Sequence, residues 1–153
     1  MSVPAAFNAS STQQVSAHAR RLVIAEIARR GGAAREVQVG RRTEVHMSGP
    51  GGPRQLRVIS RRRGDWQSSI REGLNEAEAD RFWVFVDLTT TTPSFHIGSE
   101  EAVVRGIRTR HEAYLRRNGG RRVQNNASLH CGIRLRDLDG FANRWNLLGL
   151  DNK

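Results

Sequence analysis

The sequence predicts a single α/β domain in which a mixed sheet lies between two long helices, as in an α/β/α sandwich. Residues 12–30 and 99–118 carry apolar side chains at three- and four-residue spacing, which is typical of amphipathic helices. Residues 82–88 form a nearly continuous apolar run, which is typical of a strand that is buried on both faces. The length of 153 residues fits one hydrophobic core.

The first helix is expected to begin at Ser11 or Thr12, because either hydroxyl can accept a hydrogen bond from a free amide of the first turn. Gly31 and Gly32 end it. Its apolar stripe consists of Val15, Ala19, Leu22, Val23 and Ile27. Residues 1–10 are small and polar and are expected to form a flexible tail ahead of a domain at 11–150, with no secretory signal.

Short strands are expected at 37–39, 44–47 and 55–60, the last two separated by the turn from Gly49 to Pro53. The strong strand at 82–88 follows, and a short strand at 94–97 comes after a threonine-rich loop.

Ser99 is expected to cap the second helix, with Glu100 and Glu101 at its positive end. Its buried stripe consists of Val103, Val104, Ile107, His111, Tyr114 and Leu115, and Asn118-Gly119-Gly120 ends it. A strand at 129–133 and a short helix at 138–145 are expected to close the domain. Trp83 and Trp145 are interpreted as core residues.

The net charge of +10 comes almost entirely from arginine. Of the 25 lysine and arginine residues only Lys153 is a lysine, which leaves 24 arginines. Guanidinium groups suit phosphate, so an anionic partner is one interpretation. The other is an ordinary solvated surface on which a GC-rich genome encodes arginine in place of lysine. In either case, no mechanism that needs a lysine before residue 153 is available.

Several familiar chemistries are excluded. The chain has no Gly-x-Gly-x-x-Gly motif and no phosphate loop that ends in Gly-Lys. A single cysteine, Cys131, forms neither an internal disulfide nor a thiolate zinc site, and it favours a reducing cytoplasm. The five histidines lack metal-ligand spacing, and no apolar stretch approaches the roughly 20 residues that span a membrane.

The order of the elements and a few aromatic landmarks resemble a known family. The landmarks are Leu56 to Gln67, Phe82 to Leu88, Pro93 to Ile97, His111 to Leu115 and Arg144 to Leu148. Together they resemble small bacterial domains of the PD-(D/E)XK, or restriction-endonuclease-like, superfamily, and the likeness covers about residues 12–150. The resemblance implies a nuclease site: an Asp on the second strand and a Glu or Gln on the third hold Mg²⁺, and a Lys two residues further on assists the attacking water.

On that pattern Glu44 stands at the Asp position, Arg57 at the Glu or Gln position and Ile59 at the Lys position. Arg57 opposes a cation and Ile59 carries no charge, so the resemblance implies a degenerate site without a metal. Glu26, on the helix that lines this cleft in the family, is a candidate for a replacement carboxylate. A pairing of Glu26 with Arg29 or Arg30 is the alternative.

The leading expectation is therefore a catalytically inactive nuclease-like domain that binds nucleic acid, with DNA favoured over RNA, alone or within a larger complex. The expected nucleic-acid-binding residues are Arg41, Arg42, Arg57, Arg61, Arg62, Arg63 and Trp66. Trp66 is interpreted either as a stacking platform for a base or as an anchor of the sheet edge. One alternative is a divergent Mg²⁺-dependent endonuclease that uses Glu26 and Glu44. The other is a structural subunit with an acidic protein partner, and a homodimer is compatible with all three.

Overall fold

The computed structural model describes residues 11–120 and 130–152, so the tail expected at 1–10 and the start of the strand expected at 129–133 lie outside the described residues. The elements follow one another as α2 (Thr12–Arg29), β1 (Ala33–Val39), β2 (Arg42–Ser48), β3 (Arg54–Arg61), β4 (Trp66–Ser69), η1 (Ile70–Leu74), β5 (Arg81–Asp87), β6 (Ser94–Ser99), α3 (Glu100–Arg117), β7 (His130–Ile133), η2 (Leu135–Leu138) and η3 (Trp145–Leu148). The three η elements are single 3₁₀ turns.

Five strands form a mixed sheet in the order β1-β2-β3-β5-β6. β1, β2 and β3 form an antiparallel meander, β3 and β5 are parallel, and β6 returns antiparallel to β5. The parallel pair needs a crossover, which β4 and η1 supply. β4 also pairs with β7 in a separate two-stranded antiparallel sheet.

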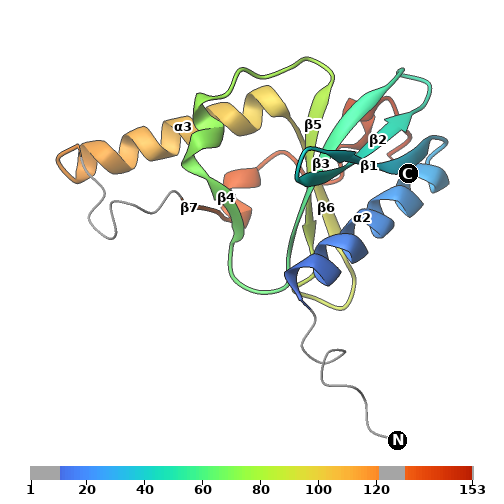
Figure 1. Ribbon diagram of the computed structural model, residues 1–153, viewed down its shortest axis with the longest axis horizontal. Helices are drawn as coiled ribbons and strands as arrows, with labels where there is room; N and C mark the ends of the chain where they lie inside the picture. Colours follow the sequence, from blue (N-terminus) through green and yellow to red (C-terminus); the bar gives the residue numbers. More distant parts are fainter. Residues whose placement is uncertain (1–10, 121–129, 153) are drawn as a thin grey trace, which may run out of the picture.

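Alternate residues of β5 point into two different cores, one on each face of the sheet. Val84 packs with Val23 and Ile27 of α2, whereas Phe85 packs with Val103 and Ile107 of α3. The two helices therefore cover opposite faces, and the β4-β7 pair shares the face of α3 (Figure 1). The α/β domain with a mixed central sheet between two long helices, predicted from the sequence, is confirmed.

Both helix starts are confirmed as well. Ser11 accepts a hydrogen bond from the Gln14 amide and Ser99 accepts one from the Ala102 amide. In α3 the buried stripe is shorter than expected, because His111, Tyr114 and Leu115 are only half-buried.

The helix expected at 138–145 is wrong. The chain forms η2 and η3 instead, and between them Gly140 and Asn143 adopt positive φ angles that no α-helix accommodates. The carbonyl of Phe141 accepts a hydrogen bond from the Ile97 amide, so this segment pairs with the edge strand β6 and cannot coil. None of the helices in the described part of the chain is long and apolar enough to span a membrane.

Candidate functional site

A cleft opens where β2 and β3 part. The two strands pair only from Val45, opposite Leu56, to Met47, opposite Arg54, so the start of β2 and the end of β3 diverge. The N-terminal half of α2 borders the gap, which encloses about 520 Å³. The cleft is lined by Thr12, Val15, Ser16, Arg20, Arg42, Thr43, Arg57, Val58, Ile59, Ser60, Arg61, Arg62, Arg63, Asp65 and Gln67.

One wall of the cleft is the edge of β3 beyond its last partner on β2. The Gln55 amide donates to the Asp80 carbonyl and the Leu88 amide donates to the Arg61 carbonyl, so the odd-numbered residues of β3 direct their backbone groups toward β5. Strand alternation then turns the backbone amides of Val58 and Ser60 toward the cleft, where β2 no longer pairs with them. The wall therefore offers backbone donors as well as guanidinium groups.

Arg57 lines the cleft but is held by two neighbours. Its guanidinium donates to Glu72 of η1 and lies 4.4 Å from the centroid of the Trp83 ring. The Arg57 side chain is 18% exposed. It is therefore a paired, largely buried cation.

Arg61 is held in the same way. Its Nη2 donates to Asp87 Oδ2 over 2.7 Å, and its guanidinium lies 4.0 Å from the Trp66 ring. Burial alone would raise the pKa of Asp87, but hydrogen bonds from Arg61 and Thr89 outweigh burial and lower that pKa to about 2. Asp87 is thus a carboxylate at any physiological pH, and it neutralises Arg61.

Trp66 is not a stacking platform. It is fully buried, and its indole nitrogen donates to the Val86 carbonyl over 3.1 Å. The anchoring interpretation is the correct one, because no base reaches a ring enclosed by Phe85, His96 and Arg61.

The exposed cations around the cleft are Arg41, Arg42, Arg62 and Arg63. Arg42 keeps 43% of its side chain exposed while it contacts Glu44 over 3.1 Å. Arg62 and Arg63, at the exit of β3, have no ion-pair partner in the part of the chain that the structure describes. Arg62 and Arg63 are therefore the cations of the lining that are available to an anion, whereas Arg42 is shared with Glu44 and Arg41 lies outside the lining.

Glu44 does not line the cleft: it is fully buried on the α3 face of the sheet, and Arg42 of the cleft lining contacts it. Arg81 binds both of its oxygens, over 2.7 and 3.3 Å, and His46 lies 3.4 Å from Oε1. Burial alone would raise the pKa of Glu44, but Arg81, His46 and Arg42 outweigh burial and keep the pKa below its ordinary value.

The divalent metal that the family resemblance implies does not fit these residues. The carboxylate of Glu44 already receives Arg81, and the neighbouring positions hold the cation of Arg57 and the alkyl side chain of Ile59. In residues 11–120 and 130–152 no three Asp, Glu, His or Cys side chains gather in a way that could hold an ion.

Glu26 does not line the cleft, contrary to its role as a replacement carboxylate. It lies in the last turns of α2, whereas the cleft is bordered by the first turns, up to Arg20. Its Oε2 accepts from Arg29 over 2.8 Å and from Arg30 over 3.1 Å, which is the pairing proposed as the alternative.

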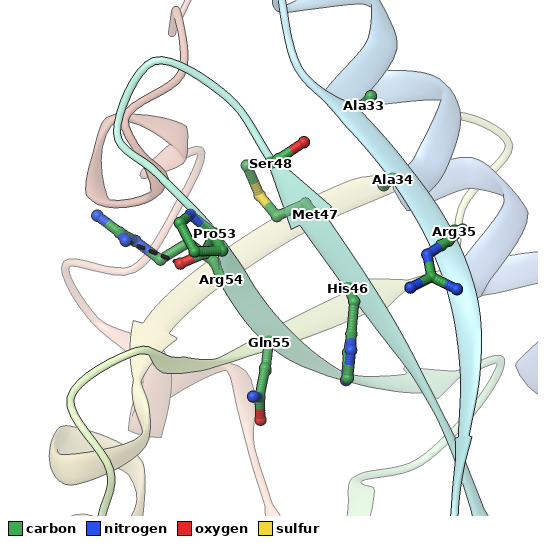
Figure 2. Close-up of a pocket in the computed structure, with 9 residues that line it drawn as sticks. All are labelled: Ala33, Ala34, Arg35, His46, Met47, Ser48, Pro53, Arg54 and Gln55. Atoms are coloured by element: carbon green, nitrogen blue, oxygen red, sulfur yellow. Dashed lines mark hydrogen bonds between the residues drawn. The ribbon is translucent and has the colours of Figure 1, made fainter.

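A row of polar side chains runs across the sheet next to Glu44. Arg35, His46, Gln55 and Arg81 are successive cross-strand partners on β1, β2, β3 and β5. Figure 2 shows the first three on one face of their strands, where they border a shallow cavity of about 420 Å³. Gln55 Oε1 accepts from Arg81 over 2.8 Å, so the row ends on the guanidinium that holds Glu44.

Sequence reasoning missed the two residues that complete this network, Arg81 and Glu100. Arg81 also contacts Glu100 over 3.3 Å, and the Trp83 indole nitrogen donates to Glu100 over 3.2 Å. An arginine directly before a doubly buried strand was the available signal, since such a cation needs a buried partner. Glu72, the partner of Arg57, lies in η1, for which the sequence predicted no structure.

The site is thus a basic cleft that Arg42 links to a network of ion pairs around the buried Glu44. The arrangement offers cations, hydroxyls and backbone amides to an anion, and the described residues hold no cluster of three Asp, Glu, His or Cys side chains that could bind a metal ion. No family model, no curated protein and no solved structure matches this chain.

Proposed function

We propose that the chain is a restriction-endonuclease-like module that has lost metal-dependent cutting and binds the nucleic-acid backbone in the cleft between α2, β2 and β3. The single observation that carries the proposal is the charge of that cleft. Six arginines line it, Arg20, Arg42, Arg57, Arg61, Arg62 and Arg63, and Asp65 is the one carboxylate in the lining. Four of the six pair with carboxylates outside the lining, so the excess charge is that of Arg62 and Arg63, which have no ion-pair partner among the described residues. A phosphate chain is the abundant polyanion that such a surface attracts.

Binding is divided between two kinds of arginine. Arg57 and Arg61 are neutralised by Glu72 and Asp87, so they set the shape of the wall. Arg62 and Arg63 extend from the end of that wall into solvent and supply the attraction. Arg41 and Arg42 approach from the β1-β2 turn on the opposite rim.

The cleft is expected to contact phosphates and not to read the bases, because its lining contains no aromatic side chain. None of the residues that border the cleft is aromatic, and all three tryptophans are fully buried. Single-stranded binders rely on aromatic rings on which bases stack. A duplex held by its backbone, with DNA favoured over RNA, is therefore the expected ligand. A cytoplasmic location, expected from the single cysteine, is compatible with it.

The test is a salt titration of binding to a fluorescent 20-base-pair duplex. With about four phosphates neutralised by the exposed arginines, the slope of log K against log salt is expected near −4. The same strand without its complement is expected to bind more weakly. Absence of binding to either form at low salt would overturn the proposal.

Matched variants locate the site. The double substitution Arg62→Ser and Arg63→Ser is expected to bring the slope about two units closer to zero. The control Arg21→Ser removes an exposed arginine of α2 outside the cleft lining and is expected to leave the slope unchanged. If the two variants lost affinity equally, the attraction would come from net charge and not from the cleft. Capture of an acidic protein that survives nuclease treatment, with no affinity for duplex, would favour the structural subunit instead.

A further inference from the structure

A third cavity, larger than the cleft, lies on the α3 side of the molecule. It encloses about 640 Å³ between the C-terminal half of α3, the β4-β7 pair and η2. A volume in this range suits a small organic ligand.

Arginines line this cavity from two parts of the chain that are distant in sequence. Arg110 and Arg117 come from α3, and Arg134 and Arg136 come from the end of β7 and from η2. Two carboxylates, those of Asp65 and Asp137, lie among these four cations, and both pair with arginines of the cavity wall. Asp137 contacts Arg110 over 3.7 Å and accepts from the Arg134 amide over 2.9 Å, while Asp65 contacts the Arg134 side chain over 3.6 Å.

Arg117 and Arg136 are the unneutralised members of the group. Both are exposed, and neither has an ion-pair partner among residues 11–120 and 130–152. The cavity thus carries an excess of two positive charges on opposite walls. A phosphate between them would complete charge-assisted hydrogen bonds that the protein itself leaves open.

Rings line the same cavity. His111 and Tyr114 are three residues apart on α3, which makes them neighbours on one face of the helix, and both are half-buried. They stand between Arg110 and Arg117 in the sequence, so planar side chains and cations share one helix face. The cleft between α2 and β3 has no such ring.

We propose that this cavity binds a single nucleotide, with its base against Tyr114 and His111 and its phosphate between Arg117 and Arg136. The nucleotide is either free in solution or the terminal residue of a strand, because the same chemistry recognises both. The proposal does not rest on the function proposed for the cleft, since Asp65 is the one residue common to the two described linings.

The chain offers a direct probe, because Tyr114 is its only tyrosine. Protein labelled with ¹³C in the tyrosine ring gives one set of ring signals, which is followed during titration with AMP, with inorganic phosphate and with a 5′-phosphorylated tetranucleotide. A saturable shift with AMP, at a concentration at least about tenfold below that needed for phosphate, is the expected result. No shift with AMP or the tetranucleotide up to about 10 mM, or equal response to phosphate, would overturn the proposal.

The variant Arg117→Ser with Arg136→Ser is expected to weaken AMP binding at least about tenfold while keeping the tyrosine probe in place. Its matched control is Arg105→Ser, because Arg105 lies on α3, away from the cavity, with 62% of its side chain exposed. Saturable AMP binding that persists unchanged in the double variant would place the ligand elsewhere and refute the assignment. Tighter binding of the tetranucleotide than of AMP identifies a strand end as the source, and the reverse order identifies a free nucleotide. Cleft binding of duplex is measured separately, so failure of one proposal is distinguishable from failure of the other.

Discussion

Arg61 lies 4.0 Å above the Trp66 ring and 2.7 Å from Asp87. One guanidinium thus joins the wall of the cleft to the core on the α3 face of the sheet. The same arrangement recurs twice. Arg57 lies over Trp83 and pairs with Glu72, and Arg30 lies over Trp145 and pairs with Glu26. Each tryptophan of this chain is thus covered by an arginine that already has a carboxylate.

Asp87→Asn is expected to lower the free energy of unfolding by about 2–4 kcal/mol at neutral pH, because it leaves the largely buried Arg61 without its counter-charge. Urea unfolding measures the loss. The control Asp80→Asn removes a carboxylate that is 74% exposed and 3.7 Å from Arg54, and it is expected to cost less than about 0.5 kcal/mol. Equal losses in both variants would contradict the role given to Asp87.

Acid is expected to remove the same contribution. The pKa of Asp87 falls from 3.8 to about 2 on folding, so the folded state binds this proton more weakly than the unfolded chain. The stabilisation, about 2 kcal/mol, is complete above pH 3.8 and is lost as the pH falls toward 2. The free energy of unfolding, plotted against pH across that range, should fall less for Asp87→Asn than for the unaltered chain. An equal fall in both proteins would refute the linkage to Asp87.

His96 is expected to destabilise the fold at mildly acid pH. The residue is buried, and none of the residues that the structure describes forms a hydrogen bond with either ring nitrogen. Burial lowers the pKa of His96 below 6.5, with Asp87 acting against that shift and Arg61 adding to it. Stability is therefore fully present above pH 6.5 and declines as the pH falls toward the folded-state pKa. His96→Phe should remove this part of the pH dependence, measured as the difference between the two proteins in urea unfolding from pH 7.5 downward. An unchanged profile would show that another group titrates.

Arg81→Met is expected to destabilise the chain by about 3–5 kcal/mol, because it strands the buried carboxylates of Glu44 and Glu100. The control Arg105→Met breaks an exposed pair with Glu101 and is expected to cost less than about 1 kcal/mol. Thermal and urea unfolding check both values. A mild effect of Arg81→Met would mean that Arg42 and His46 suffice to hold Glu44.

Gly149→Ala is expected to cost more than Gly31→Ala, although both residues have positive φ angles, +77° and +93°. A methyl group on Gly149 would lie 2.7 Å from the Gly51 Cα, so the turn before β3 must move, whereas Gly31 has open space. Gly31→Ala should cost only the left-handed backbone penalty of about 1–2 kcal/mol. Urea unfolding ranks the two, and equal losses would show that the turn yields freely.

Much of the fold was predictable because its signals are local. Ser11 and Ser99 cap the two helices where their hydroxyls precede an apolar stripe, and the apolar run at 82–88 predicts a strand buried on both faces, which the structure bounds at Arg81 and Asp87. The segment 138–145 failed for the opposite reason. Its spacing resembles a helix, but β6 offers its edge to Phe141 and Ala142, and pairing with that edge prevails over coiling.

The sequence by itself determined the two long helices, the doubly buried strand, the surplus of arginine and the absence of any lysine before residue 153. The tertiary structure alone decided which arginines are free. Arg61 meets Asp87 26 residues away and Arg81 meets Glu44 37 residues away, so no local pattern reveals either pairing. Burial then makes each pairing obligatory, because a charge removed from water needs a counter-charge at hydrogen-bond distance. For this reason Arg57 and Arg61 are fixed, paired parts of the cleft wall. Arg62 and Arg63, only one and two residues beyond Arg61, remain exposed to solvent.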